Sequence, residues 1–186
     1  VTLEILRDLK ERMAQRGRKL REAGVNTLKE YNTQCPNERM KRILFIADEC
    51  HEMFRVDENN RSASKEISNI LTMVVKEGRS QGVHLLLATQ TLANTEIGSD
   101  ILANIGNHLM LKCSIADSEK LVPKSSDITS KLNTGFVYYS EENTKFQAFY
   151  ADKKQAAEII QTINDKTKSL TSNETFYFSG ASIFHF

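Results

Sequence analysis

The chain has 186 residues, of which 40% are hydrophobic and 26% charged, and its formal net charge is +1. This length and apolar content are enough for one sizeable hydrophobic core, so we expect one main domain. The nearly neutral charge gives no argument for nucleic-acid binding by the chain as a whole, and no apolar run approaches the ~20 residues of a membrane span or forms a signal peptide. Three scattered cysteines without metal-ligand spacing are typical of a reducing compartment. Composition therefore predicts a cytoplasmic protein, with any membrane contact made only through regions outside these residues.

The first 42 residues are more basic than the rest. They contain eleven Lys and Arg against six Asp and Glu, an excess of five positive charges. Apolar residues recur at helical spacing over residues 2–23, and Gly24 follows where a helix commonly ends. We therefore predict a basic helix here, which either lies on phosphates or is simply a solvated face.

The most informative segment runs from Ile43 to Glu49, an apolar run that ends in two adjacent carboxylates, Asp48 and Glu49. Buried parallel strands are continuously apolar, and ligand sites in open α/β sheets lie at the carboxyl ends of such strands, so the segment has the form of a Walker B motif. At a strand end, Asp48 is placed to hold a hydrated Mg²⁺ on a nucleotide, and Glu49 to orient or deprotonate a water that attacks the γ-phosphate. An ordinary core strand followed by a surface turn would look the same in isolation.

A helix and a second strand follow. Residues Ile67, Ile70, Leu71, Val74 and Val75 form an apolar helix face that Ser62 or Ser64 can cap and that Gly78 or Gly82 can end. The predicted strand from Val83 to Ala88 then runs into Thr89 and Gln90, so a second strand ends in polar side chains. We read His84, at the start of this strand, as a hydrogen-bonded core residue.

The remaining elements are predicted in chain order. The polar segment from His51 to Arg61 is predicted to be an irregular loop. A short helix is predicted near Asp100 to Ile105. A strand from His108 to Cys113 precedes an antiparallel hairpin of Phe136–Tyr139 with Phe146–Tyr150. Asp152 and Gln155 form a capping box for a helix that extends to about Lys168.

Four segments occur in the order typical of a known family. Together they resemble the motor domain of FtsK/SpoIIIE-type ATPases, in the HerA–FtsK group, over roughly residues 10–150. The segments are Met13 to Asn32, Ile43 to Glu49, Gly78 to Gln90, and Ile101 to Ile105 followed by Ser114 to Ser118.

This resemblance implies a fold class and partners. The fold would be α/β, a RecA-like P-loop NTPase core with a mostly parallel sheet, incomplete at its N-terminus and spanning residues 1–168. Residues 169–186 would be a linker and the start of a following segment. The complete protein would bind ATP and Mg²⁺ and assemble with itself into a ring, typically a hexamer.

The same resemblance implies roles for individual residues. Asp48 would bind the Mg²⁺ through water, Glu49 would act in catalysis, and Thr89 would contact the nucleotide. Gln90 matches a sensor position, where an amide both donates to the γ-phosphate and accepts from the water. Arg79 matches an arginine finger that projects towards a neighbouring subunit's nucleotide, because a planar guanidinium spreads charge over phosphoryl oxygens. The alternative is that Arg79 is a helix-terminal residue that only complements the helix dipole.

Two departures from the family limit these roles. The usual Arg-Pro after the sensor is Thr91-Leu92 here, and no Gly-x-x-x-x-Gly-Lys-Ser/Thr occurs among the eight glycines. The family places that phosphate-binding loop before the Walker B segment, so we expect the chain to be a fragment that is inactive alone. A degenerate ATPase that lost the loop is the alternative.

The transported polymer stays open at this stage. By family majority it is double-stranded DNA, and the nearest alternative is a protein substrate moved by an EssC-like type VII secretion ATPase. A catalytically silent scaffold is a third reading. Among nearby residues, Cys50 is interpreted as a packing residue, His51 as a polar neighbour of the site, and Asn104, Asp117 and Ser118 as residues that fix loops by hydrogen bonds.

Overall fold

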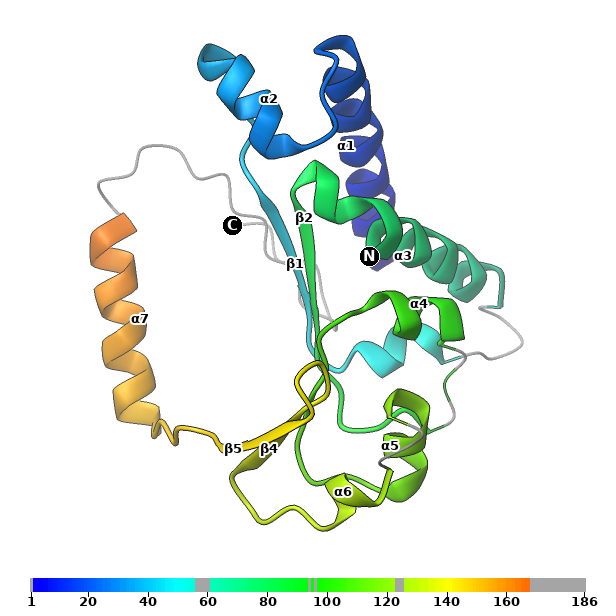
Figure 1. The fold of residues 1–186 in the computed structure, drawn as a ribbon, viewed down its shortest axis with the longest axis vertical. Coiled ribbons are helices and arrows are strands. Elements are labelled where there is room, and N and C mark those ends of the chain that lie inside the picture. The colour runs from blue at the N-terminus through cyan, green and yellow to red at the C-terminus, as the bar shows by residue number, and fades with distance from the viewer. Residues whose placement is uncertain (1, 56–60, 94, 96, 123–125, 168–186) are drawn as a thin grey trace.

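The computed structural model describes residues 2–55, 61–93, 95, 97–122 and 126–167 (Figure 1). The described helices are α1 (Thr2–Glu22), α2 (Leu28–Gln34), α3 (Arg61–Gln81), α4 (Ser99–Asn104), α5 (Ile115–Leu121), α6 (Ser126–Ser130) and α7 (Lys153–Thr167), with short 3₁₀ turns at Pro36–Glu38 and Cys50–Phe54. The strands are β1 (Ile43–Ala47), β2 (Val83–Leu87), β3 (Leu109–Met110), β4 (Phe136–Tyr139) and β5 (Thr144–Gln147).

The described strands form two sheets. In one, β1 and β2 pair in parallel from Ile43 opposite Val83 to Ala47 opposite Leu87, with α3 as the crossover. In the other, β3, β4 and β5 are antiparallel in that order. The chain is thus α/β, and the predicted parallel pairing of the two motif-bearing strands is confirmed.

One face of the parallel sheet carries the main core. Helices α1 and α3 pack against each other and α3 packs on β2, and Figure 1 shows both helices on the same side of the strands. Their predicted apolar faces supply the core, because residues at helical spacing share one face. The fully or almost fully buried members include Leu6, Leu9, Met13, Ile70, Leu71 and Val74.

The opposite face of this sheet is open among the described residues. Leu44 and Ile46 are each 60% exposed and Leu86 is 54% exposed, so the expectation of strands buried on both faces is wrong here. His84 is also exposed on this strand, which corrects its interpretation as a core residue. The physical reason is the period of two along a strand: every second side chain points away from α1 and α3.

Two glycines end the long helices. After α1, the N–H of Gly24 bonds to the carbonyl of Arg21 and the N–H of Val25 to that of Leu20, which is a Schellman arrangement around the positive φ of Gly24. After α3, Gly82 has φ of 72° and lies against Leu28, so of the two predicted terminators it is Gly82 that ends the helix. Gly78 lies inside α3.

The helix α2 was not singled out from the sequence. Thr27 and Glu30 form a capping box around its first turn, in which each side chain accepts from the other residue's backbone N–H. Leu28 and Tyr31 on its inner face are buried. The helix therefore serves to cover the start of β2 at Gly82.

The antiparallel sheet differs in detail from its prediction. The strand expected over His108 to Cys113 is limited to Leu109–Met110, because Ser114 caps α5 almost immediately afterwards and turns the chain. The return strand of the hairpin is Thr144–Gln147 rather than Phe146–Tyr150, since Asn143 takes up a positive φ and sets an earlier register. Met110, Leu132 and Tyr138 form a second, smaller core with the neighbouring short helices.

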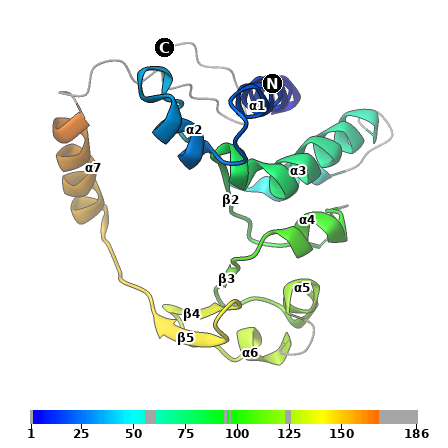
Figure 2. The ribbon, with the colours of Figure 1, turned by 45° about the horizontal axis from the view of Figure 1, so that its top comes forward.

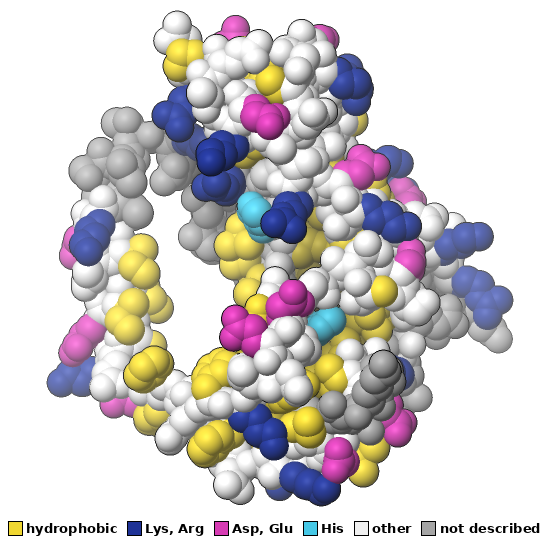
Figure 3. All heavy atoms as spheres, in the orientation of Figure 1, with side chains coloured by type: hydrophobic (Ala, Val, Ile, Leu, Met, Phe, Trp, Pro, Cys, Tyr) yellow, Lys and Arg dark blue, Asp and Glu magenta, His cyan; other side chains and the backbone are white. Residues whose placement is uncertain are grey.

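The last described helix stands apart. The Asp152–Gln155 capping box is confirmed, with Gln155 N–H donating to Asp152 and Asp152 N–H to Gln155. Figures 1 and 2 agree that α7 is separated from both sheets, and Figure 3 shows apolar side chains on it beside an opening. Residues 169–186, predicted as a linker and a further segment, lie outside the described residues.

Candidate nucleotide site

The carboxyl edge of the parallel sheet gathers four of the five predicted site residues. Ala47 pairs with Leu87 at the last position of both strands, and two backbone bonds, from Ala88 N–H to Ala47 and from Cys50 N–H to Ala88, continue the pairing beyond it. The ends of parallel strands meet at one edge of a sheet. Asp48 and Glu49 from β1 therefore lie beside Thr89 and Gln90 from β2.

Glu49 has an unusual backbone. It adopts the left-handed conformation, with φ of 51° and ψ of 43°, and its N–H donates to Asp48 Oδ1 over 3.0 Å. A non-glycine residue with positive φ is uncommon, and such conformations concentrate at functional sites. The turn points the Glu49 side chain back across the strand end towards β2.

The Glu49 carboxylate has a neighbour at each oxygen. Gln90 Nε2 donates to Oε1, and His51 Nδ1 lies 3.2 Å from Oε2. Two of the three predicted catalytic side chains, 41 positions apart, are thus in direct contact. The contact places a carboxylate, which accepts hydrogen bonds, beside an amide, which both donates and accepts them.

His51 is held on three sides. Its Nδ1 also lies 3.0 Å from Thr89 Oγ1, its Nε2 lies 3.1 Å from Glu52 Oε1, and its side chain is only 19% exposed. The sequence interpretation as a polar neighbour of the site is confirmed, but the direct contact with Glu49 was missed. The only available signal was a spacing of two residues within a tight turn.

Cys50 and Asp48 differ in surroundings. Cys50 is buried, as predicted for a packing residue, and burial raises the pKa of its thiol to about 11. Asp48 is exposed and open to solvent. Within the described parts of the chain, no three His, Cys, Asp or Glu side chains are grouped to hold a metal ion by themselves. A hydrated Mg²⁺ does not need such a group, because one carboxylate together with phosphate oxygens and waters is sufficient.

The chain is similar in sequence to known proteins. No protein-family model matches the chain. The ESX-5 secretion system protein EccC5 of Mycobacterium tuberculosis H37Rv is 26% identical over 137 residues, and the DNA translocase FtsK of Streptococcus pyogenes serotype M1 is 23% identical over 154 residues. The chain is a homologue of the FtsK-like motor ATPases. These matches cover 68% and 79% of the chain, but only 9% and 18% of the two relatives.

Solved structures share the fold. The pCW3 conjugation coupling protein TcpA, in its monomer form with ATPγS, superposes with a TM-score of 0.73 over 87% of this chain and 48% of that chain, at 22% identity. EssC (ATPases 2 and 3) from Geobacillus thermodenitrificans gives 0.67 over 91% of this chain and 32% of that one, at 16% identity. The predicted α/β fold class is therefore confirmed, and the fold is consistent with part of a RecA-like core.

The loop after Gln90 has its own anchor in this FtsK-like core. Asp117 of α5 accepts from Leu92 N–H over 2.7 Å, from Ser114 Oγ over 2.7 Å and from Thr91 Oγ1 over 3.2 Å. Burial opposes its ionisation, but these hydrogen bonds outweigh burial and lower the pKa of Asp117. Thr91-Leu92, in place of the family's Arg-Pro, is thus fixed by a carboxylate, as interpreted for Asp117. Asn104 donates from Nδ2 to the carbonyl of Asp100 within its own helix.

Arg79 is not brought to this edge. It is exposed in the last turn of α3, before β2 begins, whereas Thr89 and Gln90 follow the end of β2. The five-residue strand between them is about 17 Å long. In the FtsK-like core of a single chain, Arg79 therefore lies at the opposite edge of the parallel sheet from Asp48 and Glu49.

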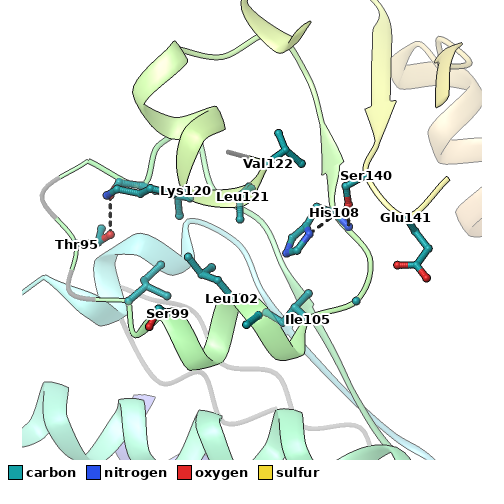
Figure 4. A pocket seen from close by; sticks show the side chains of 14 residues that line it. Thr95, Ser99, Leu102, Ile105, His108, Lys120, Leu121, Val122, Ser140 and Glu141 are labelled. Carbon is teal, nitrogen blue, oxygen red and sulfur yellow. Dashed lines mark hydrogen bonds between the residues drawn. The ribbon is translucent and has the colours of Figure 1, made fainter. Parts of the chain in front are cut away.

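A hollow lies beyond the Asp117-anchored loop (Figure 4). It is lined mainly by α4, by α5 and by the segment that leads to β3. His108 faces this hollow, and its Nδ1 is hydrogen-bonded to Ser140 Oγ over 3.3 Å. Burial lowers the pKa of His108. The hollow contains none of the predicted site residues.

Proposed function

We propose that the chain is the Walker B half of an ATP-driven translocase motor, in which residues 1–168 form part of a RecA-like domain. Homology to FtsK and EccC supports a motor ATPase of the translocase type. The observation that carries the proposal is the meeting of Asp48, Glu49, Thr89 and Gln90 at one edge of a parallel sheet. Ligand sites in such sheets lie at this edge.

Each residue has a separate role in the proposed reaction. Asp48, exposed at the strand end, binds a water of the Mg²⁺ on ATP. Glu49 accepts a proton from the attacking water, and Gln90, already bonded to Glu49, contacts the same water and the γ-phosphate through its amide. Thr89 contacts the nucleotide. When bound, Mg²⁺ neutralises charge that develops on the phosphate oxygens.

The phosphate-binding loop is proposed to come from another part of the complete protein. The chain spans 9% and 18% of its two curated relatives and 48% of the TcpA chain. The open apolar face of β1 and β2 offers a surface for that part, since Leu44, Ile46 and Leu86 are more than half exposed. Backbone N–H groups of such a loop supply most phosphate contacts in P-loop enzymes.

Double-stranded DNA is the proposed substrate, moved by a ring of identical subunits. The excess of five positive charges in residues 1–42 supports a polyanionic partner. A protein substrate, as for a type VII secretion motor, is the second candidate, because EccC5 is 26% identical to this chain over 137 residues. Among the described residues, none of the helices is both long and apolar enough to cross a bilayer.

Hydrolysis by the complete protein tests the proposal. Glu49→Gln is expected to keep ATP binding and to lower turnover at least ~10²-fold, because general-base contributions run from about 10² to 10⁴. Asp48→Asn is expected to weaken Mg²⁺-dependent binding as well. Glu77→Gln, an exposed substitution on α3, is the matched control. Unchanged hydrolysis in both site variants would remove the assignment, and stimulation of turnover by duplex DNA distinguishes DNA from a protein substrate.

A further inference from the structure

The contacts of His51 at the edge of the site indicate a role that the proposed reaction does not include. None of the roles described above involves His51. Its ring nevertheless lies 3.2 Å from Glu49, 3.0 Å from Thr89 and 3.1 Å from Glu52. The side chain is 19% exposed, whereas that of Glu52 is 55% exposed. The ring therefore lies between the site and the surface.

The hydrogen-bond partners determine where a proton must be on the ring. Thr89 Oγ1 donates its single hydrogen to the carbonyl of Thr91 over 2.8 Å, so it can only accept at His51 Nδ1. The carboxylate of Glu49 also only accepts. Nδ1 must therefore carry a hydrogen, which it donates to Thr89. Glu49 Oε2, which is buried and has no hydrogen-bond partner among the described residues, lies 3.2 Å from the same nitrogen.

The other side of the ring is also occupied. Nε2 faces Glu52 Oε1 over 3.1 Å, and Glu52 is itself paired with Arg55 over 3.0 Å. Asp48, next to Glu49, directs Oδ1 to the Glu49 N–H. Among the described residues, these are the charged groups that lie around the ring.

We propose that His51 is a positioning residue that holds the Glu49 carboxylate in place through Nδ1–H. This inference rests on the proposed function, because it assigns Glu49 as the base. Gln90 bonds to Oε1, and His51 Nδ1 lies 3.2 Å from the buried Oε2, which has no hydrogen-bond partner among the described residues, so the ring faces the charge on this oxygen. Without His51, only Gln90 and the left-handed backbone of Glu49 would orient the side chain among these contacts.

Two isosteric variants separate positioning from simple packing. Asparagine at position 51 retains a donor near the place of Nδ1, whereas glutamine retains one near Nε2. In the complete protein, His51→Gln and His51→Phe are expected to lower kcat about 10- to 100-fold with the KM for ATP within about twofold, the usual range for lost orientation. His51→Asn is expected to stay within about threefold of wild type. Equal losses in Asn and Gln, or no loss in Gln and Phe, would overturn the proposal.

A second measurement does not depend on hydrolysis. In ¹⁵N spectra of the histidine rings, with His51 assigned from the His51→Asn variant, Nδ1 is expected to resonate as a protonated nitrogen. Glu49→Gln should shift Nδ1 more than Nε2, and Glu52→Gln the reverse. A ring with a bare Nδ1 would overturn the proposal. If wild-type protein hydrolyses no ATP but these shifts appear, the proposed function fails while the contact stands.

Discussion

Gln90 donates a hydrogen bond from Nε2 to Oε1 of Glu49, so the two residues that follow neighbouring strands act as one unit. The bond exists because β1 and β2 end at the same level, with Ala47 opposite Leu87. A water bound at this place meets an amide and a carboxylate whose relative positions are already set. Preorganised polar groups of this kind contribute to catalysis because they do not have to reorganise during the reaction.

The Gln90–Glu49 contact predicts that two substitutions of Gln90 lower turnover with different pH dependence. Gln90→Ala removes the donor and is expected to lower turnover about 10- to 100-fold. Gln90→Glu places a second carboxylate against Glu49, and like charges at contact distance favour protonation of one of them. The Glu variant should therefore be less active than the Ala variant at neutral pH and should improve relative to it as the pH falls. Steady-state hydrolysis by the complete protein over a range of pH checks this, and equal pH profiles would contradict it.

The surroundings of Gly82 and Gly24 predict different losses of folding stability when each glycine is replaced by alanine. A Cβ at Gly82 would lie 2.1 Å from Leu28 Cδ2, and the residue has positive φ. Gly24 has a similar φ of 67° but no atom within 4 Å of a Cβ. Gly24→Ala is expected to lower the free energy of unfolding by about 1–2 kcal/mol, the cost of the left-handed conformation. Gly82→Ala should cost roughly 1–3 kcal/mol more, because overpacking adds to it.

Chemical denaturation of the two glycine variants provides the measurement. If Gly24→Ala and Gly82→Ala lose equal stability, then α2 moves away from Gly82 at no cost. In that case Leu28 would not hold α2 against the start of β2.

Asp117 predicts a pH-dependent contribution to stability. Its pKa is lowered in the folded chain, so its ionised form stabilises the fold above the unfolded value of about 3.9, and this contribution is lost as the pH falls through the folded pKa. Asp117→Ala is expected to lower the free energy of unfolding by about 1–3 kcal/mol at pH 7, because it leaves Leu92 N–H without its acceptor.

The matched control for Asp117 is Glu119→Ala, an exposed substitution on the same helix α5. The gap in unfolding midpoint between wild type and Asp117→Ala should be full at pH 7 and shrink below about pH 3.9. A gap that grows towards acid pH would mean that the carboxylate does not anchor the Thr91-Leu92 loop.

The 186-residue chain alone should bind ATP weakly and hydrolyse none. It contains no Gly-x-x-x-x-Gly-Lys-Ser/Thr segment, and the described carboxyl edge offers carboxylates and amides rather than a cradle of N–H groups. Calorimetric titration with Mg·ATP is the measurement. A micromolar dissociation constant would show that this chain carries a phosphate site of a different kind.

Arg79 is predicted to act on a neighbouring subunit's nucleotide. It lies at the opposite edge of the parallel sheet from Glu49, so within one chain it does not reach the site. Arginine fingers contribute about 10³ to 10⁵ to turnover. Arg79→Ala should therefore abolish hydrolysis by the assembled ring and leave ATP binding intact, whereas Lys65→Ala, exposed on the same helix, should change little.

Mixed rings give the decisive readout for Arg79. Combining Arg79→Ala subunits with Glu49→Gln subunits should restore some hydrolysis, because some interfaces then unite an intact Glu49 with an intact Arg79. Native mass spectrometry establishes that mixed rings form. Mixed rings without any recovery at any ratio would count against action between subunits.

Several structural features followed from local sequence, because their causes are local. The apolar spacing of residues 2–23, Gly24 at the end of α1 and the Asp152–Gln155 capping box are each determined by contacts within a few positions, and the structure confirms them. The apolar run before Asp48 likewise predicted β1 and its site-bearing end.

Predictions that depend on contacts with other elements of the fold were less accurate. Burial of His84 and of the second face of the strands depends on what covers the sheet, which alternation along one strand cannot reveal. The segment after Asp48 looked polar, yet Phe54 in its 3₁₀ turn is 1% exposed and belongs to the main core. The hairpin register depended on the positive φ of Asn143.

The sequence by itself determined the types of side chain at the ends of two strands and the family that orders them in this way. Only the tertiary structure decided which atoms meet. The parallel register places Gln90 on Glu49 Oε1, the left-handed turn at Glu49 places His51 on Oε2, and the length of β2 keeps Arg79 at the other edge. Apart from the local turn that joins Glu49 and His51, these relations link residues far apart in the chain and are set by strand pairing and helix packing.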